Sequence, residues 1–243
     1  MPSMSAPRPR LLVAGLALAL SLDLGSHSAA RADDTLEDSA VRMVSGLGLT
    51  PAGDTLVFSW RGDLWRVSAG GGDASRLTFH PANDTQPRVS PDGRTVAFVS
   101  NRDGPEAVYT MPLGGGTPTL RTAHTEGFRL QGWHPDGAAL LVRARLDHSW
   151  RRAERFVLRP LDAAMGLQLV FDAYGGGASY SPDGRWVAFT REGTAWWRKQ
   201  YRGSQASQVW LYDTQEETFR KLTRGDHAER WPLWAPDSKR LYV

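Results

Sequence analysis

Residues that could carry out chemistry are few in this chain. It contains no Cys, which excludes a thiol nucleophile, a disulfide framework and a Cys-based metal site. Segment 177–181 (GASYS) begins like the turn that presents a nucleophilic Ser, but it lacks the final Gly of that motif and leads into a predicted hairpin. We therefore expect no catalytic residue in this chain.

Three His residues lie two or four residues after a Thr that recurs along the chain: His80, His124 and His227. Imidazole nitrogens are common metal ligands, so three converging His could bind a metal ion. We favour another interpretation, in which each His belongs to a loop of a separate repeat and caps a turn or borders a binding surface. Glycine triplets at 70–72 and 114–116 have no helix after them to hold an anion. No metal or other cofactor is expected.

Aromatic and basic side chains are concentrated in segment 191–204. The candidate binding residues there are Trp196, Trp197, Arg198, Lys199, Tyr201 and Arg202. Aromatic and Arg side chains dominate binding hot spots, and a guanidinium can hold a carboxylate with two parallel hydrogen bonds. The segment either contacts a peptide or a neighbouring domain, or it folds back over its own repeat. We hypothesise the first, with the three His beside it.

A repeat must position all of these residues. Pro-centred turns recur at intervals of 40, 44, 47 and 54 residues, at Pro51, Pro91, Pro135, Pro182 and Pro236. In four copies an aromatic residue, a Thr or Leu, and the Pro follow one another at 13 plus 13 residues. The aromatic and middle positions are Trp65 and Thr78, Tyr109 and Thr122, Phe156 and Leu169, and Trp210 and Thr223. Self-similarity at this period indicates a repeat architecture.

All the variation in repeat length lies in one interval. From each Pro to the next aromatic position the distance grows through 14, 18, 21 and 28 residues. If each repeat is a four-stranded antiparallel sheet, this interval contains the loop between the second and third strands. That loop lies on the face opposite the Pro turns, together with the loops between repeats. We therefore expect the candidate binding residues to share one face.

Each repeat predicts four short strands. Segments 96–99 (VAFV) and 186–189 (WVAF) are apolar without alternation, which indicates strands covered on both faces. Four antiparallel strands in about 40–50 residues are the unit of a β-propeller. A parallel β-helix has shorter repeats, and a doubly wound α/β fold needs amphipathic helices that we do not find. The predicted fold is all-β, a propeller with blades at about 41–80, 84–124, 128–171 and 176–225 and a truncated fifth at 229–243.

Residues 1–32 have the organisation of a signal peptide. Arg8 and Arg10 precede the apolar run 11–20, which is too short to span a membrane, and an Ala-x-Ala sequence ends at Ala32. We expect cleavage after Ala32, a propeller domain over residues 33–243 without a membrane span, and a periplasmic or secreted location. Removing three Arg and one Asp lowers the net charge from +3 to +1, which leaves no basic excess for binding nucleic acid.

Two segments resemble known families. Segment 90–98 (SPDGRTVAF), preceded by 76–78 (RLT), is similar to the WD40-like propeller repeat of the TolB, tricorn protease and prolyl-oligopeptidase families, and the resemblance extends from about residue 41 to the end. Segment 198–203 (RKQYRG), ahead of the strand 208–213, resembles the N-terminal propeller of bacterial tricorn-like serine peptidases of the S41 family. In that family the propeller filters or guides peptide substrates, and the catalytic residues lie in a C-terminal domain.

The resemblance implies a non-catalytic, substrate-handling or protein-binding propeller of an exported tricorn-like serine peptidase. Its partners would be a peptide or protein substrate, or the C-terminal peptidase domain of the same protein. One alternative is a TolB-like periplasmic propeller that binds a protein, although the small domain that precedes the TolB propeller has no room between Ala32 and the first blade. The other alternative is the propeller of a prolyl-oligopeptidase-type enzyme.

Overall fold

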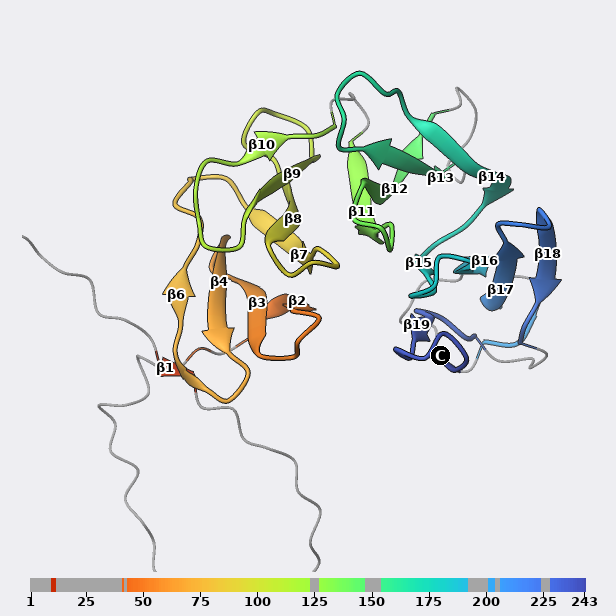
Figure 1. Ribbon diagram of the computed structural model, residues 1–243, viewed down its shortest axis with the longest axis horizontal. Coiled ribbons are helices and arrows are strands. Elements are labelled where there is room, and N and C mark those ends of the chain that lie inside the picture. The colour runs from red at the N-terminus through yellow and green to blue at the C-terminus, as the bar shows by residue number, and fades with distance from the viewer. Residues whose placement is uncertain are drawn as a thin grey trace, which may run out of the picture.

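Four antiparallel sheets of four strands each are arranged around a common axis as the blades of a β-propeller (Figure 1). The computed structural model describes residues 10–11, 41, 43–122, 127–146, 154–191, 201–203, 206–223 and 228–243. These residues form strands and turns without a helix, so none of them belongs to a helix that could cross a membrane. The predicted all-β propeller is confirmed.

In each blade the strands follow one another from the axis outward. Blade 1 contains β2 (Ser45–Leu49), β3 (Thr55–Trp60), β4 (Asp63–Ser68) and β6 (Ser75–Arg76). Blade 2 contains β7 (Asp84–Val89), β8 (Thr95–Ser100), β9 (Ala107–Pro112) and β10 (Thr119–Leu120). Blade 3 contains β11 (Phe128–Trp133), β12 (Ala139–Arg145), β13 (Glu154–Pro160) and β14 (Gln168–Tyr174). Blade 4 contains β15 (Ala178–Tyr180), β16 (Trp186–Arg191), β17 (Gln208–Asp213) and β18 (Thr218–Lys221).

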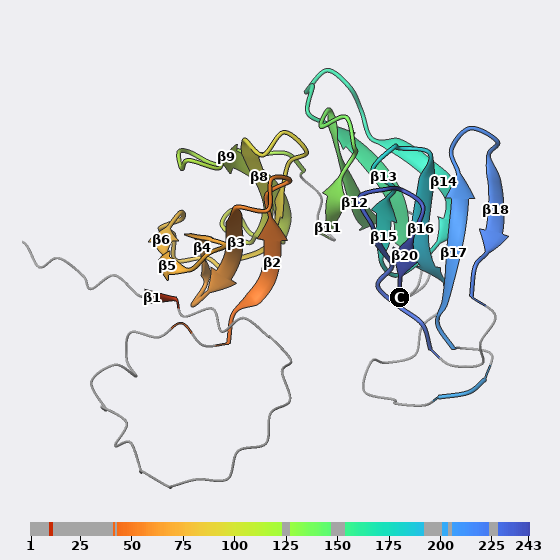
Figure 2. The same cartoon turned by 60° about the horizontal axis from the view of Figure 1, so that its bottom comes forward.

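Two smaller sheets complete the described structure. β19 (Leu233–Trp234) pairs with β20 (Leu241–Tyr242) where the partial fifth blade is predicted. β1 (Arg10–Leu11) pairs with β5 (Gly72–Asp73) at the edge of blade 1. In the tilted view of Figure 2, β17 and β18 run side by side at the right-hand edge of the molecule.

In a blade that has a neighbouring blade on each side, the second strand is buried on both faces. In β8, Val96 and Phe98 pack toward blade 1, whereas Ala97 and Val99 pack toward blade 3. All four are at most 1% exposed. Successive strand residues point to opposite faces, so burial on both faces requires a continuous apolar run. This packing explains the lack of alternation in segment 96–99.

The repeated Thr holds the outer part of a blade to its third strand. The Oγ1 atoms of Thr78, Thr122 and Thr223 accept hydrogen bonds from the backbone N–H groups of Leu64, Val108 and Val209 at 2.9, 2.8 and 3.0 Å. In blade 3, Leu169 occupies this position and pairs with Val157 in the β13–β14 ladder. Where the outermost strand is short, the Thr hydroxyl therefore takes the place of a backbone acceptor for an N–H group of the third strand.

The Pro turns share one hydrogen-bonded geometry. In blade 2 the Gly93 N–H donates to the Ser90 carbonyl at 2.9 Å, and the Ser90 hydroxyl donates to the Asp92 carboxylate at 2.5 Å. Gly93 has a φ of +72° and Gly184 one of +76°. A side chain rarely adopts this conformation, which explains Gly at the last turn position in four of the five copies.

Candidate functional site

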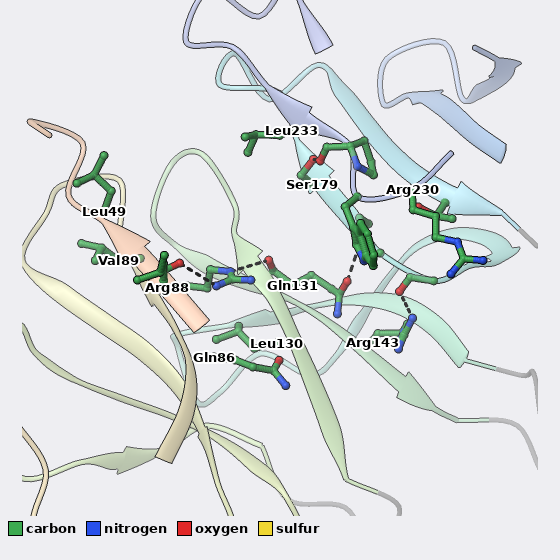
Figure 3. A pocket seen from close by; sticks show the side chains of 18 of the residues that line it. Leu49, Gln86, Arg88, Val89, Leu130, Gln131, Arg143, Ser179, Arg230 and Leu233 are labelled. Atoms are coloured by element: carbon green, nitrogen blue, oxygen red, sulfur yellow. Dashed lines mark hydrogen bonds between the residues drawn. The ribbon is translucent and has the colours of Figure 1, made fainter. Parts of the chain in front are cut away.

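A cavity of about 850 Å³ lies on the propeller axis, where the innermost strands of the sheets converge (Figure 3). Its polar lining residues are Gln86, Arg88, Gln131, Arg143, Ser179, Thr190, Ser207 and Arg230. Its larger apolar lining residues are Leu47, Leu49, Val89, Leu130, Trp231 and Leu233. The four blades and β19 all contribute lining residues, so the cavity forms only when the repeats are assembled around the axis.

Bulges in the innermost strands aim side chains at the axis. Pairing shifts within β2, β7 and β11. Five residues before the turn Pro, three sheets hold a residue in the left-handed conformation: Gly46 (φ +56°), Gln86 (φ +53°) and Trp231 (φ +57°). This conformation costs a residue other than Gly about 1–2 kcal/mol. Gln86 and Trp231 both line the cavity, so part of the backbone strain of the described chain lies at this site.

Arg88 places a guanidinium on the cavity wall that contacts backbone carbonyls. Its Nε donates to the Gln131 carbonyl at 3.4 Å, and its Nη1 donates to the carbonyls of Leu47 and Pro87 at 3.4 and 3.0 Å. These carbonyls belong to three different blades. Burial lowers the pKa of Arg88 below its ordinary value, because a medium of low dielectric constant disfavours the charge. Arg88 forms no ion pair within the part of the chain that the structure describes.

Arg143 also lines the cavity, but it has a carboxylate partner. Its Nε lies 2.6 Å from Glu154 Oε2, and its Nη1 donates to the carbonyls of Gly175 and Gly176 in the link between blades 3 and 4. Burial is the main reason why the pKa of Arg143 is lowered, and the Glu154 carboxylate opposes that shift. Arg143 therefore acts first as a connection between two blades.

Arg230 and Trp231 border the cavity ahead of β19. The Arg230 Nε donates to Ser207 Oγ at 2.9 Å, and the Glu229 N–H donates to the Ser207 carbonyl at 2.9 Å. Ser207 ends the longest variable loop, and Trp231 is 73% exposed. The start of blade 4's third strand and the segment that leads into β19 thus meet at one rim of the cavity.

Trp side chains connect two of the inner strands, β11 and β19, to the preceding sheet. The indole N–H of Trp133 donates to the Arg88 carbonyl at 2.9 Å, and the indole N–H of Trp234 donates to the Ser179 carbonyl at 3.1 Å. Each Trp lies two residues before the turn Pro of its own sheet. Each acceptor lies three residues before the turn Pro of the preceding sheet. In addition, the Gln131 side-chain oxygen accepts from the Ala178 N–H at 3.1 Å. The wall is therefore held by polar contacts between strands.

The predicted binding residues are only partly within the described structure. Trp196, Trp197, Arg198, Lys199, His124 and His227 lie outside the described residues. Tyr201 and Arg202 are described and do not line the cavity. His80 is exposed, and its Nδ1 accepts from the Ala82 N–H at 3.1 Å, so it caps a turn. In the part of the chain that is described, no three His, Asp or Glu side chains gather as metal ligands.

The cavity residues themselves do not figure in the sequence prediction. Arg88, Gln131 and Trp231 lie three, four and five residues before a turn Pro. The strand that enters this turn is the innermost strand of each blade, so polar residues there were the available signal. The individual strands look like ordinary surface strands, and only their convergence around the axis creates the site.

Fold and cavity together define this chain as a β-propeller domain with an axial cavity. The family described as the tricorn protease N-terminal beta propeller domain matches residues 50–242. Tricorn protease homolog 1 of Streptomyces coelicolor is 33% identical over 194 residues, which cover 77% of this chain and 18% of that protein. The chain belongs to the family of tricorn protease N-terminal propeller domains.

Solved structures show the same fold. The crystal structure of the tricorn protease has a TM-score of 0.63 at 16% identity, over 80% of this chain and 19% of that one. TolB from Acinetobacter baumannii has a TM-score of 0.65 at 16% identity, over 82% of this chain and 48% of that one. The chain thus spans less than a fifth of the length of each tricorn protein, and at these identities the structures bear on the fold alone.

Proposed function

We propose that this chain is the non-catalytic propeller of an exported tricorn-like serine peptidase. In this role it binds segments of peptide or protein substrate and guides them toward a peptidase domain of the same protein. Membership of the tricorn propeller family supports this proposal. Export is proposed from the organisation of residues 1–32, and it is tested by sequencing the N-terminus of the mature protein, which we expect to begin after Ala32.

The axial cavity is the observation that carries the proposal. Ligand pockets in proteins typically measure about 300–1,000 Å³ and combine an apolar lining with a few polar groups. At about 850 Å³ the cavity lies within that range, and its wall alternates Leu side chains with Arg, Gln and Ser. An extended polypeptide segment suits such a wall, because it presents both apolar side chains and regularly spaced amide groups.

Trp231 offers a test of this assignment with a matched control. Trp231 at the cavity and Phe79 in a loop between blades are both 73% exposed, so truncating either one disturbs little packing. We expect Trp231→Ala in the full-length protein to weaken binding of a labelled, unstructured peptide about tenfold, as loss of an aromatic anchor does. Phe79→Ala should leave the affinity unchanged. Fluorescence anisotropy measures both.

The opposite result for the two variants would place the peptide-binding site outside the cavity. If Phe79→Ala weakens binding and Trp231→Ala does not, the peptide is held by the loop face alone, near His80, and the cavity is not the binding site. If no unstructured peptide binds while a folded protein does, the TolB-like alternative replaces the peptidase-linked function.

A further inference from the structure

The charge of the axial cavity is one-sided. Three of its lining residues are Arg88, Arg143 and Arg230, and none of the described lining residues is Asp or Glu. Charge on a concave wall of low dielectric constant raises the local concentration of ligands of opposite sign. A binding site built in this way distinguishes ligands by charge as well as by shape.

Arg88 is the source of the uncompensated charge. Arg143 already has an acidic partner inside the protein, because the Glu154 carboxylate lies 2.6 Å from its Nε, although Arg129 and Arg145 share that carboxylate. Arg88 lines the cavity and has backbone carbonyls as its partners in the described chain, through Nε and Nη1, while its Nη2 donates to no described residue. Arg88 is half-buried, and a partly desolvated cation without an anion is unfavourable. A ligand carboxylate relieves this cost without breaking an existing ion pair.

Gln86 stands two residues from Arg88 on the same strand. Its side chain forms no hydrogen bond with a described residue, although its backbone is held at a φ of +53°. Gly46 occupies the equivalent place in blade 1, so a Gly would serve the backbone there. The strained Gln86 therefore keeps an amide in the cavity that can both donate to and accept from a peptide group.

We propose that the cavity selects polypeptide segments that carry Asp or Glu side chains, with Arg88 binding the side-chain carboxylate and Gln86 the adjacent peptide group. This inference rests on the proposed function, and it specifies the substrate class of the same cavity. Segments rich in Lys or Arg are rejected, because they bring like charge toward Arg88.

Four peptides of one length test the proposal on the full-length protein. Three have blocked termini and differ only in bearing Glu, Gln or Lys at the same positions, and the fourth is the Gln peptide with a free C-terminus. We expect the Glu peptide to bind about tenfold more tightly than the Gln peptide, the scale of one charge-assisted contact. The Lys peptide should bind more weakly than the Gln peptide, and added salt should reduce both differences.

Variants assign the selectivity to a residue. Arg88→Gln should abolish the preference for the Glu peptide while the Gln peptide still binds, and Arg88→Lys should retain part of it. The control is Arg220→Gln on the exposed strand β18, which removes the same charge away from the cavity and should leave the preference intact. Unfolding temperatures of all variants show whether Arg88 is also needed for stability. If Arg88→Gln does not fold, Arg88→Lys and the peptide series still decide.

The outcomes separate this inference from the proposed function. Equal affinity for the Glu, Gln and Lys peptides would overturn charge selection and leave peptide binding in place. A gain confined to the peptide with a free C-terminus would show that the cavity recognises a chain terminus, which also overturns the inference. If none of the four peptides binds, the proposed function itself is wrong.

Discussion

Thr122 illustrates how a single hydroxyl fixes a repeat at the residue scale. The side chain is 3% exposed, and its Oγ1 accepts from the Val108 N–H at 2.8 Å. Thr78 and Thr223 make the same contact in other blades. A buried N–H without an acceptor loses its hydration without compensation, so the Thr spacing in the sequence records a hydrogen bond that each of these blades needs.

Thr122→Val should lower the free energy of unfolding by about 1–3 kcal/mol, the cost of leaving one buried N–H unpaired. Urea unfolding measures the change. Thr122→Ser keeps the hydroxyl and is the control, with a smaller expected loss. A Val variant that is as stable as the Ser variant would show that the hydrogen bond is not what the repeat preserves.

At the scale of the element, the bulged inner strands determine what the cavity can do. β7 is displaced in its pairing with β8, and Gln86 sits at the displacement in a conformation that suits Gly. The equivalent position in blade 1 is Gly46, which adopts the same positive φ without steric strain because it has no Cβ atom. Blade 2 therefore gives up stability to present a polar side chain to the axis.

Gln86→Gly should accordingly raise the free energy of unfolding by about 0.5–1 kcal/mol, because Gly accepts a positive φ and only part of the gain is lost to its greater freedom in the unfolded chain. It should at the same time weaken binding of the Glu peptide. Gln86→Ala is the matched control, since it removes the amide but keeps the strain, so it should weaken binding without the gain in stability. A Gly variant that is less stable than the original would contradict the interpretation.

The sequence predicts strands more readily than it predicts the site. The strand at 96–99 is recognisable because burial on both faces removes the alternation of a surface strand. The turn Gly residues are recognisable because their conformation excludes side chains. Arg88 and Gln131 give no such signal, because they become a site through contacts between blades that lie more than forty residues apart. Local spacing does not report which polar residues will face each other across an axis.

At the scale of the whole molecule, the proposed function depends on several blades together forming the wall of the cavity. Arg88 contacts β2 and β11, Gln131 contacts β15, and Trp234 connects β19 to blade 4. These hydrogen bonds between blades lie at or near the surface of the cavity. A ligand on the axis therefore contacts several blades at once and should stabilise their arrangement.

Hydrogen–deuterium exchange of the full-length protein, with and without a saturating unstructured peptide rich in Glu, tests the axial site most directly. The account predicts that the peptide slows exchange in β7, β11 and β15 and in the segment 228–232, which surround the cavity, and leaves the outer strands β10 and β18 unchanged. Slower exchange confined to the outer strands, or to the loops around His80 and Arg202, with β7 and β11 unaffected, would contradict it.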